Sequence, residues 1–248
     1  MKTRILALVI LIAATAFSIP GVSFAAIAFD TANSNAVSNN SATLSLTHTA
    51  AGPNGIGFAY VATNYAITGV TWNGAAMTLV ATGTPTNLSF GSLYYILNPA
   101  TTSASVIATR NNSGNTSAFV LQTASYTGVN QSSTLNATSS QKAGSIVFSY
   151  TSSITLPSSA WVIMASDGAS QSWTNSAGTG STKRTSLTPS AYNGSELYDS
   201  NGAQTGTYSM TASFANGNVN PVHIMAGFTE AGGGASAACH IKVIGRCH

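Results

Sequence analysis

The sequence contains few ionisable side chains. Only 5% of its 248 residues are charged, whereas about 25% is ordinary for a soluble domain. Ion-pair networks are therefore not expected to be the main source of stability. Hydrophobic residues make up 44%, which is enough for a core and excludes a highly charged, unfolded chain. Polarity comes instead from Ser, Thr, Asn and Gly, so we expect an almost neutral surface of hydroxyl and amide groups.

Positive charge is also scarce, and half of it lies near the chain ends. Of the eight Lys and Arg residues, four are Lys2, Arg4, Lys242 and Arg246. The other four are spread through the body of the chain. Nucleic-acid binding requires clustered cations that displace counterions from phosphates, so we exclude nucleic acid as a partner.

The five acidic residues do not form a recognisable catalytic pair. A glycosidase needs two carboxylates that face each other at about 5–10 Å. Glu196 and Asp199 are three residues apart, which places them on opposite faces of a strand. Asp30 and Glu230 end the first and last predicted strands and would meet if those ends lie together, although such positions also suit solvated or capping residues.

Histidine and serine give no clearer sign of nucleophilic catalysis. His48 shares strand parity with Leu44 and Leu46, which predicts a core or rim position, and His223 lies on the opposite face of its strand from Val222. The sequence does not indicate a neighbouring acid that would orient either imidazole ring, and no G-x-S-x-G motif is present. We assign no catalytic residue; the sequence favours a protein without enzymatic activity but does not decide the question.

The N-terminus has the pattern of a secretory signal peptide. Residues 1–4 form a short basic start, and Ile5–Phe17 is an apolar run followed by Pro20. Small residues at Ser23 and Ala25 predict cleavage after residue 25. The alternative is an N-terminal membrane anchor, but the run is shorter than the roughly 20 residues that span a bilayer. We therefore expect a secreted or cell-surface protein with no membrane span after cleavage of residues 1–25.

Residues 232–248 form a glycine-rich joint and a tail that holds both cysteines. Cys239 and Cys247 enclose seven residues, and an oxidising compartment favours a disulfide between them. Free or intermolecular thiols are the second interpretation. The third is a metal site that also uses His240 and His248.

Residues 26–231 show a succession of strand patterns and are interpreted as one domain. Thr207–Phe214 alternates polar and apolar residues, as expected of a half-buried strand, whereas Leu93–Leu97 and Trp161–Met164 are apolar throughout, as in central strands. Asn-Gly pairs, which suit hairpin turns, predict a hairpin at Asn73-Gly74 and a turn near Asn216-Gly217, between 207–214 and 222–230. The pattern predicts an all-β, antiparallel two-sheet sandwich with about a dozen or more strands.

Several segments together resemble a β-sandwich module of secreted bacterial proteins. They are AIAFD, SATLSLTHT, VTWNGAAMTLV, LYYILNPATTSASVIAT, ASYTGVNQSSTL and HIMAGFTE. The resemblance covers roughly residues 26–230 and implies a jelly-roll, concanavalin A-like fold of the kind found in surface or carbohydrate-associated proteins. It brings no catalytic residues, and a sandwich fold by itself does not fix a function.

Sugar binding uses flat aromatic rings with hydroxyl and amide groups and needs few charges. Trp173, in a polar segment with Asn175, is either a binding platform or a lid over the core, whereas Trp72 and Trp161 are predicted core residues. The Lys183-Arg184 pair is interpreted as a solvated hairpin tip, with contact to an anionic glycan as the alternative. These four residues, Trp173, Asn175, Lys183 and Arg184, are the candidate ligand contacts.

We expect no cofactor, with calcium as the one alternative. No D-x-[DN]-x-[DN]-G loop is present, and Asp167 and Asp199 are the candidate calcium ligands. The sequence thus favours a secreted, non-catalytic binding or adhesive module for a glycan or another cell-surface polymer. The alternatives are a self-associating structural subunit of an extracellular coat or fibre, and a polysaccharide hydrolase with an unrecognised site.

Overall fold

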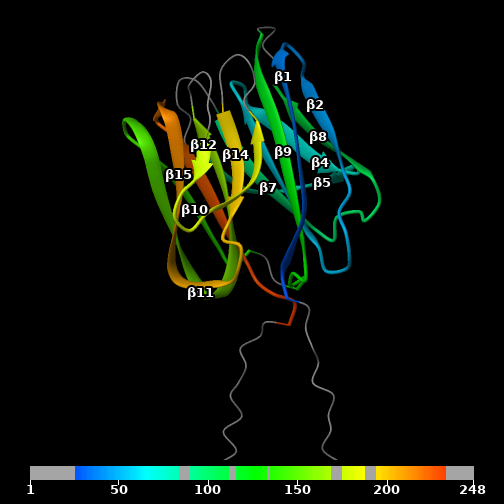
Figure 1. The fold of residues 1–248 in the computed structure, drawn as a ribbon. Coiled ribbons are helices and arrows are strands. Elements are labelled where there is room, and N and C mark those ends of the chain that lie inside the picture. Colours follow the sequence, from blue (N-terminus) through cyan, green and yellow to red (C-terminus); the bar gives the residue numbers. More distant parts are fainter. Residues whose placement is uncertain are drawn as a thin grey trace, which may run out of the picture.

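A computed structural model describes residues 26–83, 90–111, 116–132, 135–168, 175–187 and 194–232. Over these ranges the chain forms sixteen strands in three antiparallel sheets and no helix (Figure 1). The predicted all-β, antiparallel sandwich class is confirmed, although the strands form three sheets instead of two. Among the described residues, none belongs to a helix that is long and apolar enough to cross a bilayer. The predicted signal peptide and both cysteines lie outside the described residues.

The first sheet has five strands and lies in the interior of the molecule. Its strands, in spatial order, are β1 (Ala28–Asn39), β9 (Ser117–Thr127), β3 (Ile56–Thr63), β7 (Phe90–Leu97) and β6 (Thr78–Thr82). β3 and most of β9 are buried on both faces. A strand that is covered on both sides has no need of polar alternation, which explains why β3 is apolar up to Thr63. β9 also buries polar side chains, among them Gln122, Thr123 and Ser125.

The second sheet has four strands and covers one face of the first. Its order is β2 (Thr43–His48), β8 (Ala104–Arg110), β4 (Ile67–Trp72) and β5 (Ala75–Ala76). Alternate residues of β2 are buried and exposed, so this sheet has one covered face and one open face.

The third sheet covers the other face of the first sheet and then folds over itself. Its main path is β10 (Ala137–Lys142), β16 (Val222–Phe228), β11 (Ile146–Gly168), β14 (Gly194–Asp199) and β13 (Thr182–Leu187). Trp161–Asp167 of β11 pairs with β16, whereas Ile146–Leu156 pairs with β15 (Gln204–Val219), which also pairs with β12 (Asn175–Ala177). The register shifts between Leu156 and Ala160, so β11 takes part in two successive layers.

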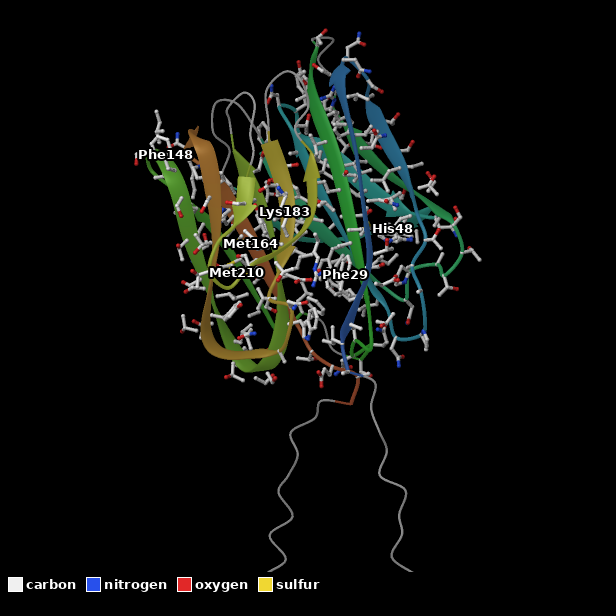
Figure 2. All side chains as sticks on the ribbon, viewed as in Figure 1. Phe29, His48, Phe148, Met164, Lys183 and Met210 are labelled. Atoms are coloured by element: carbon white, nitrogen blue, oxygen red, sulfur yellow. The ribbon has the colours of Figure 1, made fainter. Side chains whose placement is uncertain are left out.

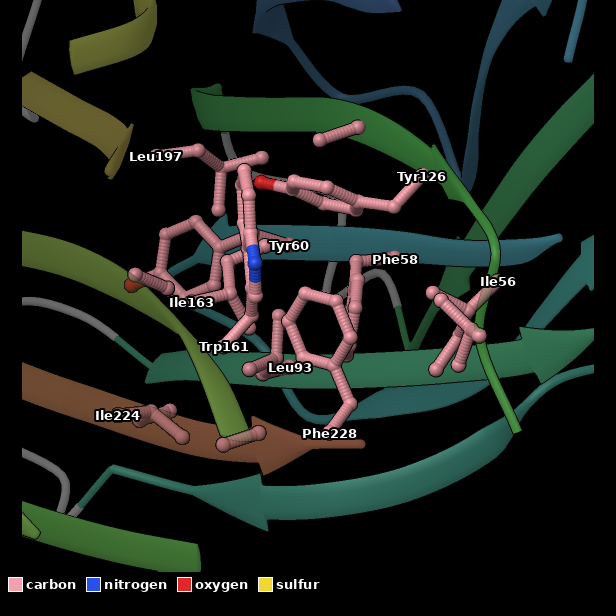
Figure 3. Close-up of a cluster of buried hydrophobic side chains, with 14 of the residues drawn as sticks. Ile56, Phe58, Tyr60, Leu93, Tyr126, Trp161, Ile163, Leu197, Ile224 and Phe228 are labelled. Atoms are coloured by element: carbon pink, nitrogen blue, oxygen red, sulfur yellow. The ribbon is translucent and has the colours of Figure 1, made fainter. Parts of the chain in front are cut away.

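Three hydrophobic clusters lie between these layers. The central cluster joins the first sheet to the main path of the third and is rich in aromatic rings; Tyr126 contacts Trp161, Phe58 and Phe228 at centroid distances of 5.0–6.1 Å (Figure 3). A second cluster lies under the β2–β8–β4 sheet and includes Trp72. The third lies beneath the β11–β15 layer. Trp72 and Trp161 are 1% and 8% exposed, which confirms both as core residues.

The two predicted turns have different outcomes. Asn73 and Gly74 have positive φ angles of 50° and 81° and join β4 to β5, as a two-residue hairpin requires. The residues that follow leave this hairpin, because β6 pairs with β7 in the first sheet. The turn predicted near Asn216-Gly217 comes slightly later: β15 includes this pair and continues to Val219, and the turn comes at Asn220, whose φ is 53°.

Side-chain amides occupy two sheet edges. On the edge strand β2, the carbonyl oxygens of Thr47 and Ser45 accept hydrogen bonds from Asn33 Nδ2 (2.8 Å) and Asn35 Nδ2 (2.7 Å) of β1. On the edge of the β11–β15 layer, Gln141 binds both backbone groups of Ser153, with Nε2 donating to the carbonyl (2.9 Å) and Oε1 accepting from the amide (3.2 Å). Backbone groups that would be free to pair with another strand are therefore already bonded.

Candidate functional site

The outer face of β11 and β15 carries a ladder of hydroxyl groups. In both strands alternate residues point into the core, where Ile154, Leu156, Met210 and Ala212 are buried. The residues between them are Ser or Thr and point outward. The four rungs of the ladder are the pairs Ser149–Ser213, Thr151–Thr211, Ser153–Ser209 and Thr155–Thr207. Ser176 of β12 pairs with Ser213 and widens the first rung; these nine residues are called the hydroxyl face.

The spacing of the hydroxyl face follows from sheet geometry. Neighbouring strands lie about 4.8 Å apart, and successive rungs lie about 7 Å apart along a strand. Thr151 Oγ1 and Thr211 Oγ1 are 2.8 Å apart and hydrogen-bonded, and Thr155 Oγ1 and Thr207 Oγ1 are 3.3 Å apart. Most of the nine residues are exposed, and Ser153, Thr211 and Ser213 are half-buried. The face is therefore an open, regular array of donors and acceptors.

Two large apolar side chains lie at one end of this face. Phe148 is 67% exposed and Ile146 is 63% exposed, and Phe148 projects at the edge of the β11–β15 layer in Figure 2. Val147, between them, packs against the third core cluster, so its two neighbours point to the outer side of the strand. The register shift between Val147 and Ser149 places Phe148 directly before the first rung.

Lys183 and Arg184 do not form a solvated hairpin tip, as the sequence suggested. Both lie in β13 and form ion pairs with buried acids of β14: Lys183 Nζ is 2.8 Å from Glu196 Oε1, and Arg184 Nε is 2.6 Å from Asp199 Oδ2. Arg184 also lies 4.1 Å from the centre of the Phe29 ring. The prediction failed because buried carboxylates on the adjacent strand attract both cations. Contact of Lys183 or Arg184 with an anionic glycan remains a prediction.

The buried carboxylates each lie beside a tyrosine. Tyr126 donates a hydrogen bond of 2.9 Å to Asp199, Tyr198 donates one to Glu196, and Tyr60 lies beside Asp167. Burial raises the pKa of Tyr60 and of Tyr126 well above the usual value for a phenol, and the neighbouring negative charge adds to the effect. Both phenols therefore stay protonated, and Tyr126 serves as a donor to Asp199.

The three buried acids, Asp167, Glu196 and Asp199, do not converge on a shared site. Glu196 and Asp199 contact groups on opposite faces of β14, as expected from their spacing. Asp167 pairs with Ser195, and Asp199 pairs with Ile163; this offset of four residues corresponds to about 13 Å along the strands, more than the separation in a glycosidase. Asp30 does not end the first strand, since β1 continues to Asn39.

The calcium candidates differ in how fully they are bonded. Asp199 accepts hydrogen bonds from Tyr126, Arg184 and the backbone amide of Asn201, which leaves little capacity for a cation. Among the described residues, no three His, Cys, Asp or Glu side chains are grouped as a metal site would require. Calcium binding by Asp167 is an untested prediction.

Both described histidines are buried and neutral. His48 forms hydrogen bonds with Thr123 (2.8 Å) and Ser125 (2.9 Å), which confirms the prediction of a core position with bonded ring nitrogens. Nδ1 of His223 is 3.0 Å from the Ser152 hydroxyl. Burial lowers the pKa of His48 to about 4 and that of His223 to about 3.

Three of the predicted site residues are not among those that the structure describes. Trp173, Cys239 and Cys247 lie outside the described residues, so the binding platform and the disulfide remain predictions. Asn175 belongs to β12, where its backbone pairs with Phe214. One small cavity of about 10 Å³, lined by Ile56, Leu97, Phe228 and their neighbours, holds at most about one water molecule.

Comparisons with known proteins add no assignment: no protein-family model, curated protein or solved structure matches the chain. The resemblance to secreted bacterial sandwich modules therefore remains a prediction, and the jelly-roll topology is not specifically confirmed. Fold and surface chemistry are the basis for a functional proposal.

Proposed function

We propose that the chain is an extracellular, non-catalytic binding module that holds glycans on the hydroxyl face, with the Phe148 ring as an apolar contact. The observation that carries the proposal is the exposed Phe148 ring directly beside the first rung of the ladder. A sugar has apolar C–H patches as well as hydroxyl groups. An aromatic ring beside an array of hydroxyl groups offers a partner to each.

Hydrogen bonds on this face give limited affinity per group. Each replaces a bond to water and contributes about 0.5–1.5 kcal/mol. The exposed aromatic ring adds a contribution of a different kind, because covering Phe148 removes apolar area from water. The face therefore suits a ligand with many hydroxyl groups, held reversibly.

A second candidate is a structural subunit that associates through its neutral faces. Thr43, Ser45 and Thr47 of β2 are exposed on the outer side of the second sheet, so the molecule has a second face rich in hydroxyl groups. The amides of Asn33, Asn35 and Gln141 occupy two edges through which strands would otherwise pair between copies. Assembly by strand addition is disfavoured at those edges, and glycan binding is the better-supported function.

A glycan array probed with the full secreted chain tests the proposal. We expect binding to one or more glycans and about a tenfold loss of affinity in Phe148→Ala, which corresponds to about 1.4 kcal/mol. Leu79→Ala is a matched control, since Leu79 is 49% exposed on β6 of another sheet. Light scattering measures self-association in parallel. Absence of binding to every glycan, together with concentration-dependent assembly, would favour the structural subunit.

A further inference from the structure

We infer that the ligand of the hydroxyl face is an uncharged glycan in an extended conformation, bound along β11 and β15. Its affinity is therefore expected to rise with the number of sugar units. This inference rests on the proposed function and specifies its ligand class. It follows from three features of the face: its charge, its length and its open ends.

The hydroxyl face is electrically neutral. Residues 146–160, 175–182 and 204–219 contain no Asp, Glu, Lys or Arg. The nearest paired cations in the sequence, Lys183 and Arg184, form ion pairs with Glu196 and Asp199. The strands that form the face thus offer an anionic glycan no cation to offset its lost hydration, whereas an uncharged glycan exchanges hydrogen bonds with water for hydrogen bonds with hydroxyl groups.

The ladder is longer than a single sugar. From Ser149 to Thr155 is six residues, or about 20 Å at the rise of a β-strand. Because each rung contributes little, one sugar unit that touches one rung binds weakly. A chain that touches all four rungs combines their contributions, and each further rung is expected to raise affinity by a factor of about 2 to 10.

The described surroundings of the face form no wall at its far end. Beyond the last rung, Pro157, Ser158 and Ser159 on one strand and Thr205 and Gly206 on the other are exposed. At the near end lies the exposed Phe148 ring. A site of this shape accommodates an internal stretch of a polymer, because it does not require a chain end.

Affinity measured against chain length tests the inference. The probes are uncharged oligosaccharide series of one to eight units from β-1,4-glucan, β-1,4-linked N-acetylglucosamine and α-1,4-glucan, with an oligogalacturonate series as the anionic comparison. For the full-length protein, we expect affinity in one neutral oligosaccharide series to rise at least tenfold from the disaccharide to the hexasaccharide and then level off. Binding to oligogalacturonate should be weaker.

Variants locate the effect on the ladder. Thr155→Val with Thr207→Val removes the hydroxyl groups of the far rung and should lower affinity several-fold for long oligosaccharides but not for disaccharides. Phe148→Ala should lower affinity for both. Thr43→Val with Thr47→Val, on β2 of the opposite outer sheet, is the control and should change neither; melting temperatures verify that each variant is folded.

The outcomes separate the inference from the function on which it rests. Neutral glycans that bind with a Phe148-dependent affinity but without dependence on length, or without any effect of the far-rung variant, would overturn the inference and leave the proposed function intact. Preference for oligogalacturonate would also overturn it. No binding to any glycan would refute the proposed function itself.

Discussion

Replacing Asp199 with alanine should destabilise the fold more than a typical surface substitution does. Asp199 is fully buried and accepts hydrogen bonds from Tyr126 (2.9 Å), Arg184 (2.6 Å) and the amide of Asn201 (3.0 Å). Without the carboxylate, a cation whose side chain is only 14% exposed and a buried phenol both lose their partner. Removing one member of a buried ion pair costs about 3–5 kcal/mol.

Urea unfolding followed by circular dichroism measures this change. For a chain of this size, 1 kcal/mol corresponds to about 2–4 °C, so the melting temperature of Asp199→Ala should fall by about 6–20 °C. Arg184→Met should also destabilise, because it leaves Asp199 without its cation. The double variant should cost at least about 2 kcal/mol less than the sum of the two single changes, since neither charge is then left without the other.

Additive effects in this cycle, or a loss below about 1 kcal/mol in Asp199→Ala, would refute the reasoning. Either result would mean that the Arg184–Asp199 pair behaves as an exposed surface pair. The burial of Asp199 would then not make its ion pair with Arg184 stronger than one at the surface.

Two further predictions concern pH and backbone packing. The pKa values of His48 and His223 are about 4 and about 3 in the folded state, below the usual value of 6.5 for histidine, so the unfolded chain binds protons more readily. The free energy of unfolding should be at its full value above about pH 7 and fall as pH is lowered, by about 2 kcal/mol per histidine between pH 7 and pH 5. His223→Leu should make the free energy of unfolding less dependent on pH. Urea midpoints that do not change over this range would contradict the low pKa values. Gly91→Ala should destabilise the fold clearly, because a Cβ there would lie 2.2 Å from the Tyr60 hydroxyl. A Cβ at Gly69 would have no atom within 4 Å, so Gly69→Ala should change stability little. Similar melting temperatures for the two variants would refute this prediction.

Local pattern predicted the strands well but not how they are layered. The alternation in 207–214 correctly predicted an inward face of Tyr208, Met210, Ala212 and Phe214, and it placed His48 correctly. The third sheet arises because β11 continues for 23 residues and changes partners near Pro157. That change depends on contacts with strands far away in the sequence, which no local period encodes.

The candidate site was only partly visible in the sequence. The outward Ser and Thr residues of β15 could be assigned from alternation, and the same rule applied to 149–155 gives the other half of the ladder. Their pairing into rungs depends on the register of β11 against β15, which is a long-range property. The exposure of Phe148 depends on a shift in that register, and the engagement of Lys183 and Arg184 depends on acids contributed by β14.

The amide groups at the sheet edges tie the stability of those edges to the chemical lifetime of three side chains. Loss of ammonia turns asparagine or glutamine into an acid, which accepts hydrogen bonds but donates none when ionised. At Asn33, Asn35 or Gln141 the new carboxylate would face a backbone carbonyl oxygen that formerly received a proton donor. Repulsion would then replace attraction, and the strand edge would be released for pairing with a neighbour. Slow chemical damage at three uncharged side chains would therefore convert a protected sheet edge into one prone to aggregate, with no change elsewhere in the core.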